Sequence, residues 1–167
     1  MAWIDPKGLL KVAEDLVRPI KGQPLQARLR RSISTAYYSL FTALTNVISD
    51  PYQGEAKNMA KRLVEHGAAR SVCKELLDQR KVPWLSGTPA CDPSLLDFAE
   101  QFVDLQKSRM IADYDHNYKP AKRDALDAIS AARQGLINLE SARKTSKDQL
   151  QAVCVAMIAK DRKRLRQ

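Results

Sequence analysis

Hydrophobic residues recur every three or four positions through most of the chain, and this spacing predicts amphipathic helices. The clearest row belongs to the segment that begins at Pro24, where one helix face carries Leu25, Leu29, Ile33, Tyr37, Leu40, Leu44 and Val47. A second row follows Asp92-Pro93 and runs through Leu95, Phe98, Phe102, Leu105, Arg109, Ala112 and His116. Because no convincing alternating run suggests a strand, the pattern predicts an all-α fold.

Proline, glycine and capping residues divide the chain into about six helical segments. Asp5-Pro6 begins a short helix that should end near residue 18, and Lys119-Pro120 begins the fifth helix. Residues 55–79 read as one further helical stretch, and 82–91, with two prolines and a glycine, as a loop. We expect an antiparallel up-and-down bundle over residues 1–143, and a basic C-terminal helix over 144–167 that Thr145 or Ser146 caps.

The composition narrows the classes of function. No apolar run approaches the roughly 20 residues of a membrane span, and the N-terminus lacks the apolar stretch of a secretory signal, so we expect a soluble cytoplasmic protein. The formal net charge of +9 favours polyanionic partners, of which nucleic acid is the most frequent and an acidic protein the alternative.

Neither a metal nor a cofactor is expected. The three cysteines, Cys73, Cys91 and Cys154, are widely spaced and lack a C-x-x-C motif, which argues against both a disulfide framework and a zinc site. The acidic residues near 97–104 and 113–115 have no histidine at ligand spacing and read as helix surface. No glycine-rich phosphate loop is present.

The chain has two histidines, and His116 has the more suggestive setting. Arg109 precedes it by seven positions, nearly two helical turns, so both side chains would share a face about 10 Å apart along a straight helix. They could hold one phosphate if the helix breaks near residues 113–115 or if a second copy contributes. Alternatively, Arg109 pairs with Asp113 and His116 simply ends the helix. His66 reads as a structural or surface residue.

Two stretches resemble a known family. They are ARLRRSISTAYYSLFTAL, at residues 27–44, and SRMIADYDHNY, at residues 108–118, and the resemblance to the HEPN family covers about residues 5–140. HEPN domains are helical bundles of prokaryotic toxins and defence ribonucleases. Their signature is an arginine and a histidine a short distance apart, which corresponds here to Arg109 and His116. The resemblance implies a homodimer in which both signatures face one cleft and cleave RNA without a metal.

We therefore expect a metal-independent endoribonuclease in which His116 is the general acid or base and Arg109 stabilises charge on the phosphate. Arg28, Arg31, Tyr38 and Tyr118 are the expected RNA contacts. An apolar row leads into Arg109 and consists of Phe98, Phe102 and Leu105. We expect this row to form a subunit interface or the wall of the cleft.

Three alternatives stay open. Met110 follows Arg109, where the family often has a polar residue, so the chain could be a non-catalytic module that binds RNA, a nucleotide or a partner protein. It could also be a toxin that an acidic antitoxin silences. Finally, His116-Asn117-Tyr118 resembles the ending of the signature in a toxin subfamily whose tyrosine is nucleotidylated.

Overall fold

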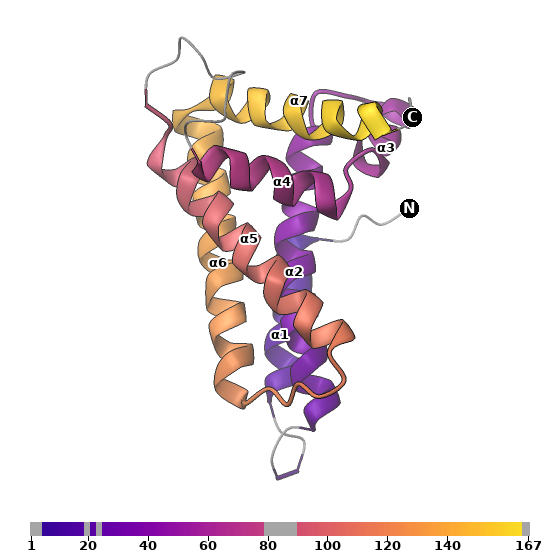
Figure 1. Cartoon of the computed structure of the whole chain (residues 1–167), viewed down its shortest axis with the longest axis vertical. Helices are drawn as coiled ribbons and strands as arrows, with labels where there is room; N and C mark the ends of the chain where they lie inside the picture. Colours follow the sequence, from indigo (N-terminus) through magenta and orange to yellow (C-terminus); the bar gives the residue numbers. More distant parts are fainter. Residues whose placement is uncertain (1–4, 19–20, 23–24, 79–89, 165–167) are drawn as a thin grey trace. The chain divides into compact units, whose positions relative to one another are not determined.

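The computed structural model describes residues 5–18, 21–22, 25–78 and 90–164, the last five of these as backbone only. Within these ranges the chain forms helices and no strand (Figure 1). The helices are α1 (Pro6–Val17), α2 (Gln26–Ser49), α3 (Gly54–Arg62), α4 (His66–Leu77), α5 (Pro93–Tyr114), α6 (Lys122–Thr145) and α7 (Lys147–Arg164). The predicted all-α class is confirmed.

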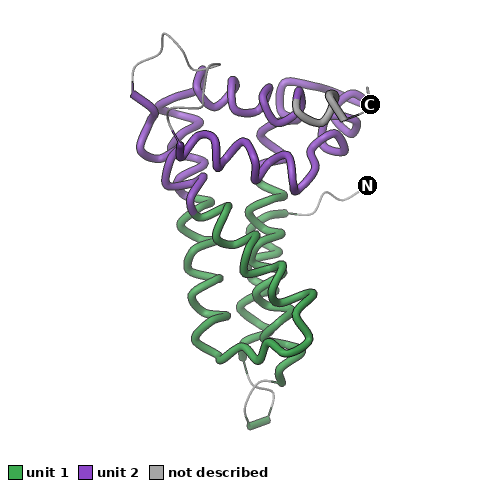
Figure 2. The backbone as a smooth tube through the Cα atoms, in the orientation of Figure 1, with its two compact units in different colours: residues 1–43, 101–136 green, residues 44–100, 137–167 purple. Residues whose placement is uncertain are grey.

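The chain divides into two compact units, which Figure 2 shows in different colours. Unit 1 consists of residues 1–43 and 101–136, and unit 2 consists of residues 44–100 and 137–167. The long helices α2, α5 and α6 each contribute residues to both units. Every interaction described below lies within one unit.

Unit 1 contains α1 and parts of α2, α5 and α6, which alternate in direction along the chain (Figures 1 and 2). At its core, the ring of Tyr37 packs against Phe41 and Phe102, with centroids 6.0 and 5.6 Å away. Leu29, Ile33 and Leu40 are also buried, as the predicted row requires. Leu25 does not join this core, since it is 70% exposed. It precedes the first residue of α2 and therefore lies before the packed part of the helix.

Helices α2 and α6 approach each other closely at Gly135. A Cβ atom built on this glycine would lie 2.9 and 3.0 Å from the two terminal methyl groups of Leu40, and 3.2 Å from Oε1 of Gln101. Leu40 is fully buried, so its methyl groups have little room to move away. Packing therefore favours glycine here, although it is a poor helix former.

Capping confirms two of the predicted helix starts. The carboxylate of Asp5 accepts hydrogen bonds from the backbone amides of Lys7 and Gly8, at 3.2 and 3.0 Å, at the start of α1. Asp92 accepts one from Ser94, at 2.8 Å, at the start of α5. Ser146 directly precedes α7 as predicted, but its hydroxyl donates backward to the carbonyl of Ala142.

The helical stretch predicted over residues 55–79 is interrupted, which corrects the sequence interpretation. It consists of α3 and α4, separated by residues 63–65. The amide of Leu63 donates to the carbonyls of both Met59 and Ala60, which tightens the last turn of α3, and Glu65 is then extended. Val64 between them is buried, so the bend delivers an apolar side chain to the core of unit 2. The loop predicted over 82–91 lies outside the described residues except for its last two positions.

Helix α7 packs against α4 within unit 2. Val72, Cys73 and Leu76 of α4, and Val153 and Met157 of α7, are buried there. All three cysteines are free. Burial raises the pKa of the Cys154 thiol to about 12 and that of Cys73 further still, so these two thiols are protonated near neutral pH.

In the part of the chain that the structure describes, no helix is both long and apolar enough to cross a membrane.

The close approach at Gly135 predicts the effect of one methyl group. Gly135→Ala should lower the free energy of unfolding by about 1–3 kcal/mol despite the better helix propensity of alanine, because the added Cβ overlaps Leu40. Gly67→Ala in α4 is the control, since a Cβ there meets no atom within 4 Å. Urea unfolding should show that Gly67→Ala is neutral or slightly stabilising. Equal effects of the two substitutions would contradict the packing described here.

Candidate functional site at the end of helix α5

Helix α5 ends at Tyr114, and His116 lies in the turn that follows. The amide of Asp115 still donates to the carbonyl of Ile111, at 3.0 Å, whereas the amide of Tyr118 donates to Asp115 at 3.2 Å and closes the turn. The carboxylate of Asp115 accepts a hydrogen bond from the amide of Asn117, at 2.9 Å. The helix thus breaks where a shared Arg109 and His116 site requires it, and the straight-helix separation of these residues does not apply.

An arginine of α2 holds this turn in place. Arg30 donates from Nε to the carbonyl of Ala112 at 2.7 Å, from Nη2 to that of Asp115 at 2.5 Å, and from Nη1 to that of Tyr118 at 3.1 Å. The last carbonyls of a helix have no intrahelical partner and carry partial negative charge. One partly buried guanidinium therefore donates hydrogen bonds to a carbonyl in the last turn of α5 and to two carbonyls in the turn that follows.

Arg109 lies one turn before the end of α5, in a partly buried setting. Its Nη2 donates to the phenolic oxygen of Tyr38 at 2.8 Å, and its Nε lies 2.8 Å from Oδ2 of Asp113. The Nε contact is an ion pair without the alignment of a hydrogen bond. The guanidinium carbon is also 5.5 Å from the ring centre of Tyr38 and 5.3 Å from that of Tyr114.

The surroundings of Arg109 keep it charged and in one position. Burial acts to lower the pKa of its guanidinium, but the hydrogen bond to Tyr38 and the charges of Tyr38 and Asp113 outweigh burial and raise this pKa. Asp113 is itself held, because Ser34 of α2 donates a hydrogen bond to its other carboxylate oxygen. Arg109 therefore carries a fixed positive charge that a neighbouring carboxylate already balances in part.

His116 is exposed, and the structure gives its side chain no hydrogen bond or ion pair with any described residue. Its Cα must lie within about 7 Å of that of Tyr114, because two residues of extended chain span no more. The ring of Tyr114 contacts the guanidinium of Arg109, and its side chain is largely exposed. The exposed imidazole and the held guanidinium thus belong to the same end of α5.

The predicted RNA contacts on α2 are not equally available. Arg28 donates from Nε to the carbonyl of Leu16 at 3.1 Å, and from Nη2 to those of Asp15 at 2.8 Å and Arg18 at 3.1 Å. It therefore caps the end of α1, as Arg30 caps the end of α5. Arg31 is exposed, and no side-chain partner is found for it among the described residues.

The two tyrosines predicted to contact RNA are half-buried. Tyr38 accepts the hydrogen bond from Arg109, as described above. Burial raises the pKa of the Tyr118 phenol. The charge of Asp124, and the hydrogen bond that the phenol donates to this carboxylate, raise it further, against a smaller opposing effect of Arg30. The phenol of Tyr118 thus remains protonated and is engaged with Asp124 at the start of α6.

The apolar row that leads into Arg109 is not an open surface, which corrects the expectation that it forms an interface or a cleft wall. Phe98, Phe102 and Leu105 are at most 2% exposed, because they fill the interior of their own units. The exposed apolar residues beside Arg109 are instead Met110 and Tyr114, at 46% and 61%. Helical periodicity identified the buried face of α5 correctly. This face packs inside the chain's own units and does not form the expected interface or cleft wall.

Sequence reasoning missed Arg30 and Ser34, because their partners lie 79 or more positions away along the chain. The available signal was a pair of serines, Ser32 and Ser34, in a helix with a long apolar row, and the structure buries both completely. A buried hydroxyl needs a hydrogen-bond partner, so such residues indicate a neighbouring helix rather than a solvated face. Ser32 accordingly donates to the carbonyl of Ala13 in α1, at 2.7 Å.

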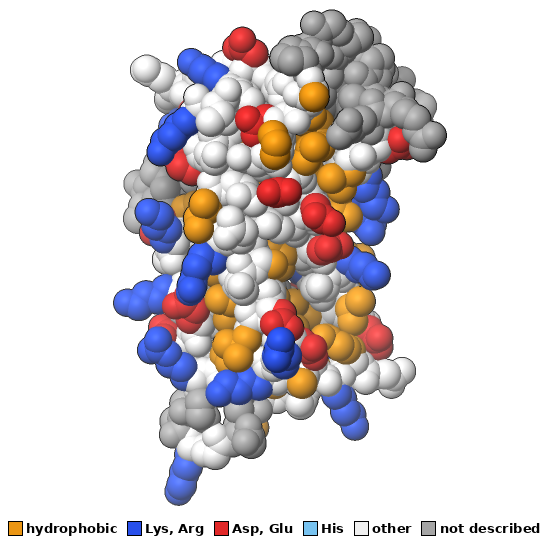
Figure 3. Space-filling model, turned by 90° about the vertical axis from the view of Figure 1, so that its left-hand side faces the viewer, with side chains coloured by type: hydrophobic (Ala, Val, Ile, Leu, Met, Phe, Trp, Pro, Cys, Tyr) orange, Lys and Arg blue, Asp and Glu red, His pale blue; other side chains and the backbone are white. Residues whose placement is uncertain are grey.

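Figure 3 shows Lys and Arg side chains dispersed over this face, with acidic side chains among them. Among the described residues, no group of three or more His, Cys, Asp and Glu side chains lies close enough together to hold a metal ion.

Comparisons with models of protein families, with curated proteins and with solved structures give no match.

The capping role of Arg30 predicts a difference between adjacent arginines. Arg30→Met should lower the free energy of unfolding by about 2 kcal/mol or more, because three carbonyls lose a charged donor. Arg31→Met removes the same charge from an exposed position and should change stability by less than about 0.5 kcal/mol. Urea unfolding compares the two variants. A similar loss in both would mean that net charge, and not the capping of α5, is responsible.

Proposed function

We propose that this chain binds RNA and cleaves it without a metal ion at the end of α5, with His116 as the proton-transfer group and Arg109 as the cation beside the phosphate. The observation that carries the proposal is the break of α5 at Tyr114. It leaves an exposed imidazole that makes no hydrogen bond or ion pair with any described residue, two positions after Tyr114, whose ring contacts the Arg109 guanidinium. The resemblance of residues 108–118 to the HEPN signature supports the same pair.

The proposed reaction is an internal displacement at phosphorus. His116 removes the proton from a ribose 2′-hydroxyl, the 2′-oxygen attacks the adjacent phosphorus, and the bond to the 5′-oxygen of the next nucleotide breaks. The leaving oxygen takes a proton from an acid, and the products carry a 2′,3′-cyclic phosphate and a 5′-hydroxyl. Arg109 stabilises the negative charge that develops on the nonbridging oxygens. A second copy of the chain supplies the complementary proton-transfer group, as in the HEPN homodimers that the sequence resembles.

One observation favours a second candidate, a module that binds RNA or a partner protein without turnover. The charge of Arg109 is already balanced in part by Asp113, 2.8 Å away, and its Nη2 donates a hydrogen bond to Tyr38. The contacts of Arg109 with Asp113 and Tyr38 stabilise the fold whether or not a substrate binds. In either role, the formal charge of +9 suits RNA or an acidic antitoxin.

The proposal predicts that a single exposed side chain separates cleavage from binding. His116→Ala should slow cleavage of a 5′-labelled single-stranded RNA roughly 10²–10⁴-fold, the usual contribution of general acid–base catalysis, and should leave RNA affinity nearly unchanged. The assay contains EDTA and follows the cyclic-phosphate product on a denaturing gel. Asn117→Ala, in the same turn and also exposed, is the control and should cleave like the wild type.

Arg109 provides the second arm of this experiment. Arg109→Ala should also abolish turnover, and Arg109→Lys should restore it only partly, because an ammonium cannot reproduce the planar grip of a guanidinium. Wild-type protein that binds RNA in EDTA but does not cut it would support the module without turnover. Cleavage that survives both His116→Ala and Arg109→Ala would exclude these residues as the catalytic pair.

A further inference from the structure

Unit 2 contains a pocket of ≈ 480 Å³ between the C-terminal turn of α2 and helix α7. This volume lies within the range of about 300–1,000 Å³ that is typical of small-molecule sites. Its aliphatic lining comes from both sides, with Val47 and Ile48 of α2 and Leu150, Val155 and Ile158 of α7. Leu150, Cys154 and Ile158 follow each other at steps of four, and Gln151 and Val155 lie one position further along, so one stripe of α7 faces the pocket.

The apolar lining is open to water in part. Val155 is 65% exposed and Tyr52, at the turn after α2, is 43% exposed. Each contributes apolar surface that a bound hydrocarbon would remove from water. The inside of this pocket therefore favours a ligand with an aliphatic part rather than a wholly polar one.

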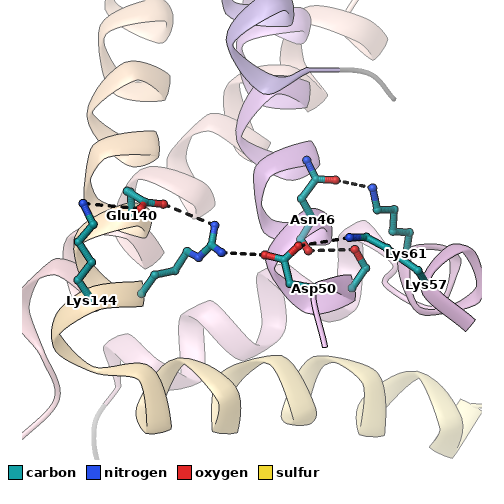
Figure 4. A network of polar contacts seen from close by, with 8 residues as sticks. Asn46, Asp50, Lys57, Lys61, Glu140 and Lys144 are labelled. Carbon is teal, nitrogen blue, oxygen red and sulfur yellow. Dashed lines mark hydrogen bonds and ion pairs between the residues drawn. The ribbon is translucent and has the colours of Figure 1, made fainter. Parts of the chain in front are cut away.

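The charged side chains that line the pocket are mostly positive. Arg143 and Lys147 line it together with one carboxylate, Asp50. Asp50 is already paired with Arg143 at 2.8 Å and with Lys57 at 3.6 Å, and Glu140 lies 3.5 Å from the other side of Arg143 (Figure 4). Lys147 is exposed and makes no ion pair or hydrogen bond with any described residue.

Lys147 is also the first residue of α7, where the helix dipole adds partial positive charge. An apolar interior whose lining includes a cation that pairs with no described residue is complementary to a hydrocarbon chain that ends in a single negative charge. We propose that this pocket binds a monocarboxylate with an aliphatic chain, with the chain against Ile48 and Val155 and the carboxylate at Lys147. The proposal concerns unit 2 and is independent of the function proposed for the end of α5.

Isothermal titration of the whole chain with hexanoate, octanoate and decanoate tests the proposal. Each added methylene should tighten binding by roughly four-fold if the chain enters the apolar interior, since burying a methylene contributes about 0.8 kcal/mol. Octanol should bind more weakly than octanoate, because it lacks the charge. No detectable binding of decanoate, or an affinity independent of chain length, would overturn the proposal.

Two pairs of variants locate the ligand. Lys147→Gln should weaken octanoate binding about two- to five-fold, the range expected for an exposed ion pair, whereas Lys144→Gln, whose side chain pairs with Glu140 at 3.7 Å and lies outside the pocket, should not. Val155→Glu should weaken it at least ten-fold, whereas Met59→Glu, similarly exposed but outside the pocket, should leave it unchanged. Circular dichroism confirms that each variant is folded. Wild-type affinity in Val155→Glu would exclude this pocket as the binding site.

Discussion

The guanidinium of Arg30 donates hydrogen bonds to three backbone carbonyls at the end of α5 and in the following turn, those of Ala112, Asp115 and Tyr118. Without such a donor, the partly buried end of a helix leaves polar groups unsatisfied, at a cost of about 1–3 kcal/mol each. The contact therefore fixes where α5 stops and how the chain turns toward α6. The position of His116 follows from that turn.

The same helix, α2, organises the rest of unit 1. Arg28 caps α1 from a position two residues earlier, and Ser32 and Ser34 donate to α1 and α5. The small side chains of Ser32 and Ser34 let the neighbouring helices come close, as Gly135 does for α6. Ser34 also links this packing to the candidate site, because it holds the carboxylate of Asp113 that pairs with Arg109. The geometry of the site is thus a consequence of how α2 is packed.

Much of the fold could be predicted from local patterns. Periodicity identified the buried residues Leu29, Ile33 and Tyr37, and capping chemistry located the starts of α1 and α5, because both signals act within a few residues. The division between α3 and α4 was not predicted, because no proline in the sequence marks the bend that brings Val64 into the core. The role of Arg30 escaped it for a different reason. Its partners are backbone carbonyls more than 80 positions away, and a carbonyl has no sequence signature.

The account depends on Arg30 being a fixed donor to the end of α5, and hydrogen exchange of arginine Nε–H groups in ¹⁵N-edited NMR spectra measures this directly. The Nε–H of Arg30 points to the carbonyl of Ala112 at 2.7 Å, so its exchange with water should be slow at a pH where that of exposed Arg31 is too fast to observe. A scalar coupling across the hydrogen bond, from Arg30 Nε to the carbonyl carbon of Ala112, would identify the acceptor. If the Nε–H of Arg30 exchanged as fast as that of Arg31, the end of α5 would not be held by this contact, and the placement of His116 derived from it would be wrong.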